Sequence, residues 1–164
     1  METVYVKRIR EVVKNKKELE DKLNVKVKIS GSQVVIEGNS LDEYGARCVF
    51  DAIAFGFSVK KAMLLKGEDM VFRVVHIKSY TKRNLRDIKS RLIGKRGKTR
   101  RTLSEISGCE ILIKESEIGI IGDALSVEDA ETAVINLIKG SKQSNMYKYL
   151  EKMNRKKNLC SDDV

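Results

Sequence analysis

The chain has 164 residues, 41% of them hydrophobic and 34% charged, and its 33 Lys and Arg against 23 Asp and Glu give a formal charge of +10. An excess of this sign favours a polyanionic partner, which is a nucleic acid, an anionic membrane or an acidic protein. No stretch approaches the roughly 20 continuous apolar residues of a membrane span, and the charged segment Met1–Arg10 lacks an apolar signal-peptide core, so we expect a cytoplasmic protein with no membrane partner.

An internal repeat organises the chain. Residues Leu19–Gly56 match a second segment at a constant offset of 84 positions, without gaps. The identical pairs include Leu19 and Leu103, Ile29 and Ile113, Ile36 and Ile120, Gly38 and Gly122, Leu41 and Leu125, Ala46 and Ala130, and Gly56 and Gly140. Two copies of one small fold are the natural explanation.

Residues 1–57 form the first copy. Its pattern predicts the order strand, helix, helix, strand, strand, helix, and a Ser-x-x-Glu cap from Ser40 to Glu43 opens the last helix. Residues 58–70 join the two copies. We expect one short helix in this linker, from Ser58 to Lys66, because Gly67 then stops it.

Residues 71–140 form the second copy, with the same order of elements. Its first strand is predicted at Val71–Ile77, and Asn84–Ile93 is predicted as a helix because its apolar residues share one stripe. The remaining predicted elements are a helix at Lys98–Ser107 ended by Gly108, strands at Cys109–Lys114 and Glu117–Ile121, and a helix that follows Ser126, is capped through Asp129 and stops at Gly140.

The C-terminal part continues as a helix. Met146, Tyr149, Leu150 and Met153 fall at helical spacing, which predicts a helix over residues 141–157 and a polar tail over residues 158–164. The whole pattern indicates an α+β protein: two tandem units, each a three-stranded antiparallel sheet packed against three helices, plus this C-terminal helix.

The positive charge is concentrated in the second copy. Between Lys78 and Arg101 there are eleven basic residues and one acid, Asp87. This segment alone nets +10, so the rest of the chain is close to neutral. A solvated helical face would not need to collect the whole excess, and the distribution therefore favours a polyanion-binding surface.

Within this segment, the loop Gly94-Lys95-Arg96-Gly97 lies between the two predicted helices. Two glycines that bracket two basic residues let the backbone turn sharply and approach a ligand closely. The amide groups at the start of the following helix favour phosphate. A nucleotide-binding P-loop is rejected, because Leu92 stands where its first glycine would be required.

The element order, the Gly-x-x-Gly loop and the two-copy arrangement resemble tandem K-homology (KH) domains of the eukaryotic type (type I). The resemblance implies that the loop clamps the backbone of about four unpaired nucleotides while an aliphatic face lies under the bases. The candidates for the floor of this groove are Ile93, Ile106, Ile111 and Leu112, although strand alternation sends some of them to the core instead. The implied RNA-binding residues are Lys89, Arg91, Ile93, Gly94, Lys95, Arg96, Gly97, Lys98, Arg100, Arg101, Ile111 and Leu112.

Over nearly its full length, the chain resembles the archaeal relatives of the ribosome-assembly factor called partner of Nob. The matching stretches are Gly56-Phe57-Ser58 with Ala62 and Leu64-Leu65, Tyr80-Thr81-Lys82, Arg91-Leu92-Ile93-Gly94, Thr99-Arg100-Arg101, and Gly140-Ser141 with Tyr147 and Leu150-Glu151. The resemblance implies binding to the single-stranded 3′ region of the small-subunit ribosomal RNA precursor. The implied protein partners are the Nob-type endonuclease that matures this RNA and the alpha subunit of translation initiation factor two.

The sequence departs from the family pattern at two places. At the 84-residue offset, Arg10-Glu11-Val12-Val13 stand opposite the glycine loop, so we expect the clamp of the first copy to be missing. Arg10 and the lysines that follow it remain able to touch RNA. Family members often carry a Pro-His pair after the Gly-Ser of the tail, where this chain has Lys142-Gln143.

No constellation predicts catalysis, a metal or another cofactor. The single histidine, His76, lies in an apolar strand pattern, and the three cysteines lack metal-ligand spacing. We therefore expect a binding protein rather than an enzyme. Two alternatives stay open: a general tandem-KH RNA regulator or chaperone unrelated to ribosome assembly, and a scaffold whose basic face meets an acidic protein.

Overall fold

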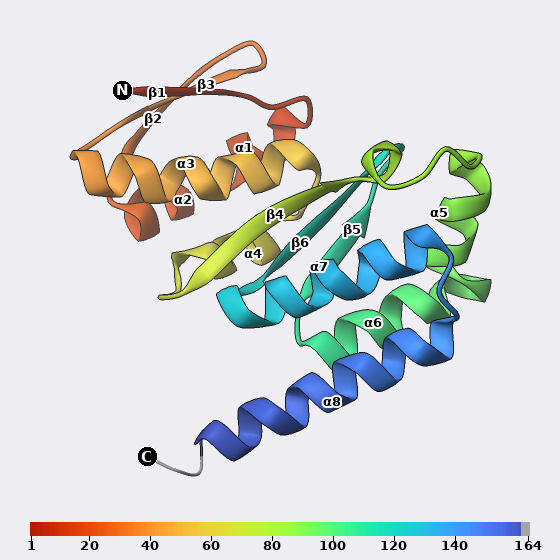
Figure 1. Cartoon of the computed structure of the whole chain (residues 1–164). Coiled ribbons are helices and arrows are strands. Elements are labelled where there is room, and N and C mark those ends of the chain that lie inside the picture. The colour runs from red at the N-terminus through yellow and green to blue at the C-terminus, as the bar shows by residue number, and fades with distance from the viewer. Residues whose placement is uncertain (162–164) are drawn as a thin grey trace. The chain divides into compact units, whose positions relative to one another are not determined.

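The structure is a computed structural model that describes residues 1–161. It divides into two compact units, the first comprising Met1–Phe72 and the second beginning at Arg73. No helix within residues 1–161 is both long and apolar enough to span a bilayer. Figure 1 labels the elements of both units.

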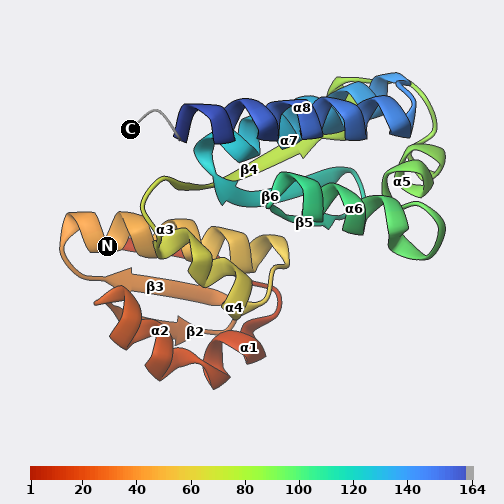
Figure 2. The ribbon, with the colours of Figure 1, turned by 90° about the horizontal axis from the view of Figure 1, so that it is seen from below.

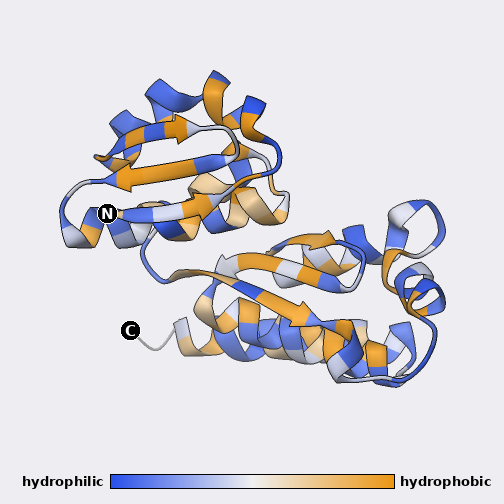
Figure 3. Ribbon diagram, turned by 90° about the horizontal axis from the view of Figure 1, so that it is seen from above, coloured by the Kyte–Doolittle hydropathy of each residue, from blue (hydrophilic) through white to orange (hydrophobic). Residues whose placement is uncertain are grey.

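The first unit contains one sheet and its covering helices. Its elements are β1 (Glu2–Tyr5), α1 (Ile9–Lys14), α2 (Lys16–Leu23), β2 (Lys26–Ser30), β3 (Gln33–Glu37), α3 (Ser40–Phe55), α4 (Val59–Ala62) and the 3₁₀ helix η1 (Met63–Lys66). The three strands are antiparallel in the order β1-β3-β2. Alternate residues of β3 are buried, and Figure 3 shows the hydrophobic residues that this strand carries. The sheet face thus meets the apolar stripe of α3, where Val49 and Phe50 are fully buried.

The second unit repeats this plan, and its first two strands in sheet order and its first two helices are longer than those of the first unit. Its elements are β4 (Met70–His76), which carries the division between the units, η2 (Ile77–Ser79), α5 (Leu85–Ile93), η3 (Lys95–Gly97), α6 (Lys98–Ser107), β5 (Glu110–Ile113), β6 (Glu117–Asp123), α7 (Ala124–Lys139) and α8 (Gln143–Ser161). The strand order is β4-β6-β5, so β5 is an edge strand. Helix α8 packs against α6 and α7, as Figures 1 and 2 show. The α+β fold predicted from the sequence is confirmed.

The 84-residue offset holds from α2 onward. It maps the start of β2 onto that of β5, the start of β3 onto that of β6, and both ends of α3 onto those of α7. Asn24 and Gly108, which end α2 and α6, share a left-handed backbone with φ of 54° and 70°. Each copy therefore ends its second helix with the same turn, which glycine and asparagine tolerate best.

The predicted helix caps are wrong in both copies. Helix α3 is capped by Asn39, whose side chain accepts a hydrogen bond from Asp42 N at 2.9 Å, and Ser40 is already the first helical residue. Helix α7 begins at Ala124, because Asp123 accepts from Ser126 N at 3.0 Å. Asn and Asp cap helices at least as well as Ser, so the residue one or three positions earlier takes the role.

The C-terminal helix is longer than predicted. Helix α8 continues to Ser161, so residues 158–161 are helical rather than part of a polar tail, while residues 162–164 lie outside the described part of the chain. Lys157 Nζ lies 2.8 Å from Asp129 Oδ2 and donates to Ser126 Oγ at 3.2 Å. This contact ties the late turns of α8 to the first turns of α7.

The linker is helical as its pattern predicts. Ser58 caps α4 by accepting from Lys61 N at 3.3 Å, and η1 carries the helical turns on to Lys66. Two phenylalanines that flank the end of α3, Phe55 and Phe57, stack with ring centroids 5.9 Å apart. Phe72 meets both rings edge-on, which gives the first unit an aromatic cluster.

Candidate nucleic-acid interface

The backbone of the loop between α5 and α6 needs both of its glycines. Gly94 has φ 74° and ψ 176°, and Gly97 has φ 74° in the left-handed region. Arg96 between them also has a positive φ, 55°, and Gly97 N donates to Gly94 O at 3.2 Å. The chain thus makes one tight 3₁₀ turn, which opens the N-terminus of α6 to solvent.

That helix end is available to an anion. Gly97 is the N-cap of the ten-residue helix α6 and has no side chain to bond the first amide groups. The first N–H groups of a helix have no partner inside the helix, and the helix dipole favours negative charge there. A phosphate oxygen is a suitable acceptor at this place.

Three cations surround the helix end. Lys95, Arg96 and Lys98 are exposed, and none of them forms an ion pair among residues 1–161. The sequence from Ile88 to Ser104 contains no Asp or Glu that could neutralise them. The predicted loop residues are therefore brought together with their charges free.

Two predicted RNA-binding arginines have further roles in the structure. Arg101 donates to the loop carbonyls, from Nη2 to Arg96 O at 3.1 Å and from Nε to Gly97 O at 3.4 Å, so it supports the turn. Arg100 is half-buried and donates from Nη1 to Ile111 O at 3.4 Å. Since Ile111 lies on the edge strand β5, Arg100 bridges α6 to the sheet edge.

Arg91, which the KH resemblance implies as an RNA-binding residue, forms hydrogen bonds within the protein. Its Nη2 donates to the carbonyl oxygens of Ser141 and Gly140, the connection between α7 and α8. In return, Gln143 Nε2 donates to Arg91 O at 3.2 Å and to Thr99 Oγ1 at 3.1 Å. Gln143 thus contacts both helices that flank the loop, a contact that the sequence pattern did not predict, although the departure from the family's Pro-His pair marked the position.

The apolar candidates divide between core and surface. Ile111 is 3% exposed and belongs to the core, which corrects its assignment to the groove floor. Ile93, Ile106 and Leu112 are half-buried, as is Lys89 on α5, one of the positively charged candidates. The prediction for Ile111 fails because its side chain takes the inward position of the pleat.

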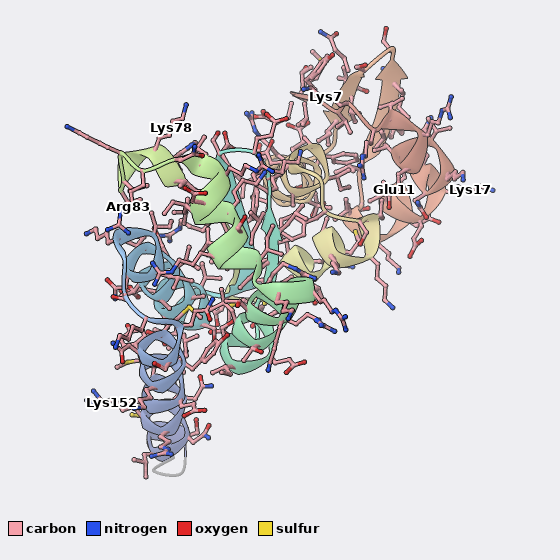
Figure 4. All side chains as sticks on the ribbon, turned by 90° about the vertical axis from the view of Figure 1, so that its right-hand side faces the viewer. Lys7, Glu11, Lys17, Lys78, Arg83 and Lys152 are labelled. Carbon is pink, nitrogen blue, oxygen red and sulfur yellow. The ribbon has the colours of Figure 1, made fainter. Side chains whose placement is uncertain are left out.

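More positive side chains precede α5. Lys78, Lys82 and Arg83 are exposed before the helix and Arg86 is exposed in its first turn, and Figure 4 shows Lys78 extending away from the ribbon. Together with the loop, they give the second unit a long stretch of positive surface. Such a surface attracts a polyanion before specific contacts form.

The corresponding loop is absent from the first unit. Helix α1 ends at Lys14 and α2 begins at Lys16, so Asn15 alone connects them. The four residues Arg10–Val13, placed opposite the glycine loop by the constant offset, lie inside α1, which corrects that alignment. The first unit lacks the clamp because its loop is deleted rather than substituted.

The groups with reactive chemistry lie apart from the loop. His76 ends β4, and its Nδ1 lies 3.7 Å from Glu117 Oε1 in an exposed pair. Burial raises the pKa of the Cys109 thiol to about 11, whereas Cys160 is exposed. Within residues 1–161, no three His, Cys, Asp or Glu side chains gather as a metal site would require.

These features define a class of protein: a three-stranded sheet backed by helices, with a Gly-x-x-Gly turn between the first two helices, is a KH domain. Residues 71–155 match the family model for the second KH domain of PNO1, described as a eukaryotic-type KH domain (KH domain type I). The chain belongs to this family, the KH-domain proteins related to PNO1 and Dim2p.

Three relatives illustrate the similarity. A KH domain-containing protein of Methanocaldococcus jannaschii is 30% identical over 149 residues, which cover 86% of this chain and 66% of that protein. The pre-rRNA-processing protein PNO1 of Candida albicans is 31% identical over 100 residues, 58% of this chain and 36% of its own length. The crystal structure of an a/eIF2alpha–aDim2p–rRNA complex from Pyrococcus horikoshii contains a chain with a TM-score of 0.83 and 29% identity, matched over 96% of this chain and 94% of that one.

Proposed function

We propose that this protein binds single-stranded RNA, with the loop Gly94–Gly97 and the first turn of α6 as its principal grip. The observation that carries the proposal is the combination of an uncapped helix end with the free cations of Lys95, Arg96 and Lys98. A backbone phosphate satisfies both, since it accepts from the amide groups and pairs with the side chains.

The neighbouring surface suits unpaired bases. Half-buried Ile93, Ile106 and Leu112 supply aliphatic contact area on α5, α6 and β5. Arg100 lies between α6 and the edge strand β5. Its guanidinium N–H groups could donate to an acceptor on a base edge in place of Ile111 O. A duplex would offer its phosphates, but its Watson–Crick edges are occupied by base pairing, so single strands are preferred.

The relatives indicate which RNA to test. Their names associate them with pre-rRNA processing and with a complex that contains rRNA and the alpha subunit of initiation factor two. We propose that this protein binds the 3′ region of the small-subunit rRNA precursor and presents it to a Nob-type endonuclease. The initiation-factor alpha subunit is a second proposed partner. The protein itself acts as a binder rather than as an enzyme.

Titration with labelled RNA tests the proposal. A single-stranded oligonucleotide from the 3′ region of the small-subunit rRNA should bind more tightly than a shuffled sequence of equal length, and a duplex should bind most weakly. Equal affinity for the single strand and the duplex would leave only general polyanion attraction, which is the result that an acidic-partner scaffold predicts.

Co-sedimentation distinguishes the proposed assembly factor from a general tandem-KH regulator. An assembly factor should travel with small-subunit precursors in a gradient of cell extract. A general regulator or chaperone should instead travel with messenger RNA, and its binding to the rRNA sequence should not exceed its binding to the shuffled one.

A further inference from the structure

We infer that Gln143 is a positioning residue for RNA binding: through Thr99 and Arg91 it holds the helices on both sides of the glycine loop at the separation that the RNA requires. The inference rests on the proposed function and adds the device that shapes its site. The residue concerned lies on α8, outside the loop itself.

Hydrogen bonds run in both directions between the helices that flank the loop and the segment before and at the start of α8. The amide nitrogen of Gln143 donates to Arg91 O near the end of α5, at 3.2 Å, and to Thr99 Oγ1 in the first turn of α6, at 3.1 Å. The guanidinium of Arg91 donates back to Ser141 O and Gly140 O. Both helices that carry the loop are thereby bonded to the segment that begins α8.

Gln143 is suited to this role by its chemistry. Its amide nitrogen carries two hydrogens and so can serve both acceptors at once. Thr99 is 4% exposed, and its hydroxyl faces Gly94 across the turn, so a shift of Thr99 would move the loop directly. Loss of the amide would leave Arg91 O and Thr99 without this donor and allow α5 and α6 to separate.

The expected effect is on affinity more than on folding. The core of the second unit is apolar and does not depend on Gln143, which is only half-buried. A loop that must be ordered by the RNA binds less tightly than one that is already ordered. Removal of an uncharged side chain also leaves the number of phosphate contacts unchanged, so the salt dependence of binding should not change.

The test uses the full chain with Gln143→Leu, Thr99→Val and the double variant, and Asn145→Leu serves as a control at an exposed position of the same helix turn. RNA affinity is measured by titration at several salt concentrations, below the unfolding transition of each variant. Gln143→Leu should weaken binding about fivefold to tenfold with an unchanged salt slope, since two hydrogen bonds are lost. The double variant should be no weaker than Gln143→Leu alone, because both changes remove one connected contact.

Amide hydrogen exchange of Gly94 and Gly97, whose N–H groups donate to Ser90 O and Gly94 O, provides a second readout in the RNA-free protein. Exchange should accelerate in Gln143→Leu and stay unchanged in Asn145→Leu. Unchanged exchange in Gln143→Leu, or unchanged affinity in a folded Gln143→Leu protein, overturns the inference. If the unaltered protein fails to bind RNA, the proposed function is wrong, and the exchange measurement still decides whether Gln143 holds the loop.

Discussion

The side chain of Thr99 fills the space that a Cβ on residue 94 would occupy. A Cβ built on Gly94 would lie 2.8 Å from Thr99 N and 2.7 Å from Thr99 Cβ, closer than real Cβ contacts come. Gly97 has the same φ of 74°, yet a Cβ there would have no atom within 4 Å. The two glycines therefore serve different purposes. Gly94 allows close packing of Thr99 in addition to its positive φ, whereas Gly97 is needed only for its left-handed backbone conformation.

This difference predicts unequal effects of alanine substitution. Gly97→Ala should lower the free energy of unfolding by about 1 kcal/mol, from the left-handed conformation alone. Gly94→Ala adds a steric clash and should cost about 3 kcal/mol and weaken RNA binding by at least about tenfold. Denaturant titration and RNA titration measure the two effects, and equal losses of stability would contradict the assignment.

The charge of the loop is tested by Lys95→Asp with Arg96→Asp. The double variant should bind RNA at least about 100-fold more weakly, because two charge-assisted contacts are replaced by repulsion. Its thermal unfolding should stay near that of the unaltered chain, since both side chains are exposed. Lys152→Asp with Lys156→Asp on α8 makes the same change in net charge and should lower the affinity less than about threefold.

Salt dependence reports the number of phosphates that are neutralised. Each contact on a single strand contributes roughly 0.7 to the slope of log affinity against log salt. Three to five contacts at the loop and its flanking cations should therefore give a slope between about −2 and −4. A slope near zero in a titration from low to moderate salt would exclude electrostatic binding at this surface.

Because only the second unit has a glycine loop, the same change of charge should affect RNA affinity differently in the two units. Arg10 and Lys14 are exposed on α1, where the first unit has no loop between its helices. Changing both to Asp alters the charge as much as the loop variant does, yet should weaken RNA binding less than about fivefold. If this variant binds as poorly as the Lys95/Arg96 variant, the principal grip is not the glycine loop.

The buried thiol of Cys109 should be protected from reagents. Its pKa of about 11 lies above the ordinary value of 9.0, so the folded thiol stays protonated where the unfolded one ionises. The contribution of this pKa difference to the free energy of unfolding is fully present below pH 9.0 and is lost as the pH rises toward about 11. Alkylation at pH 8 should modify exposed Cys160 rapidly and Cys109 only in denaturant, as peptide mass mapping can show.

The sequence by itself determined the features that are encoded locally. The apolar periods of α5 and α6 and the glycine-bracketed charges of Gly94–Gly97 lie within short segments, and hydrophobic period and turn chemistry act over such distances. The repeat is visible because two such segments match at an offset of 84 positions. The element order and the position of the loop were therefore predictable. So was the loss of the clamp in the first unit, though not its cause, the single-residue connection at Asn15.

Only the tertiary structure decided which side chains act on the loop. Arg91 and Gln143 are separated by 52 positions in the chain, and their contact exists because α8 packs across α6 and α7. Likewise, the alternation of β5 allowed either Ile111 or Leu112 to face inward, and the packing of the sheet placed Ile111 in the core. The hydrophobic pattern of the sequence indicates which residues share a face of an element, whereas the packing of distant elements determines what each face contacts.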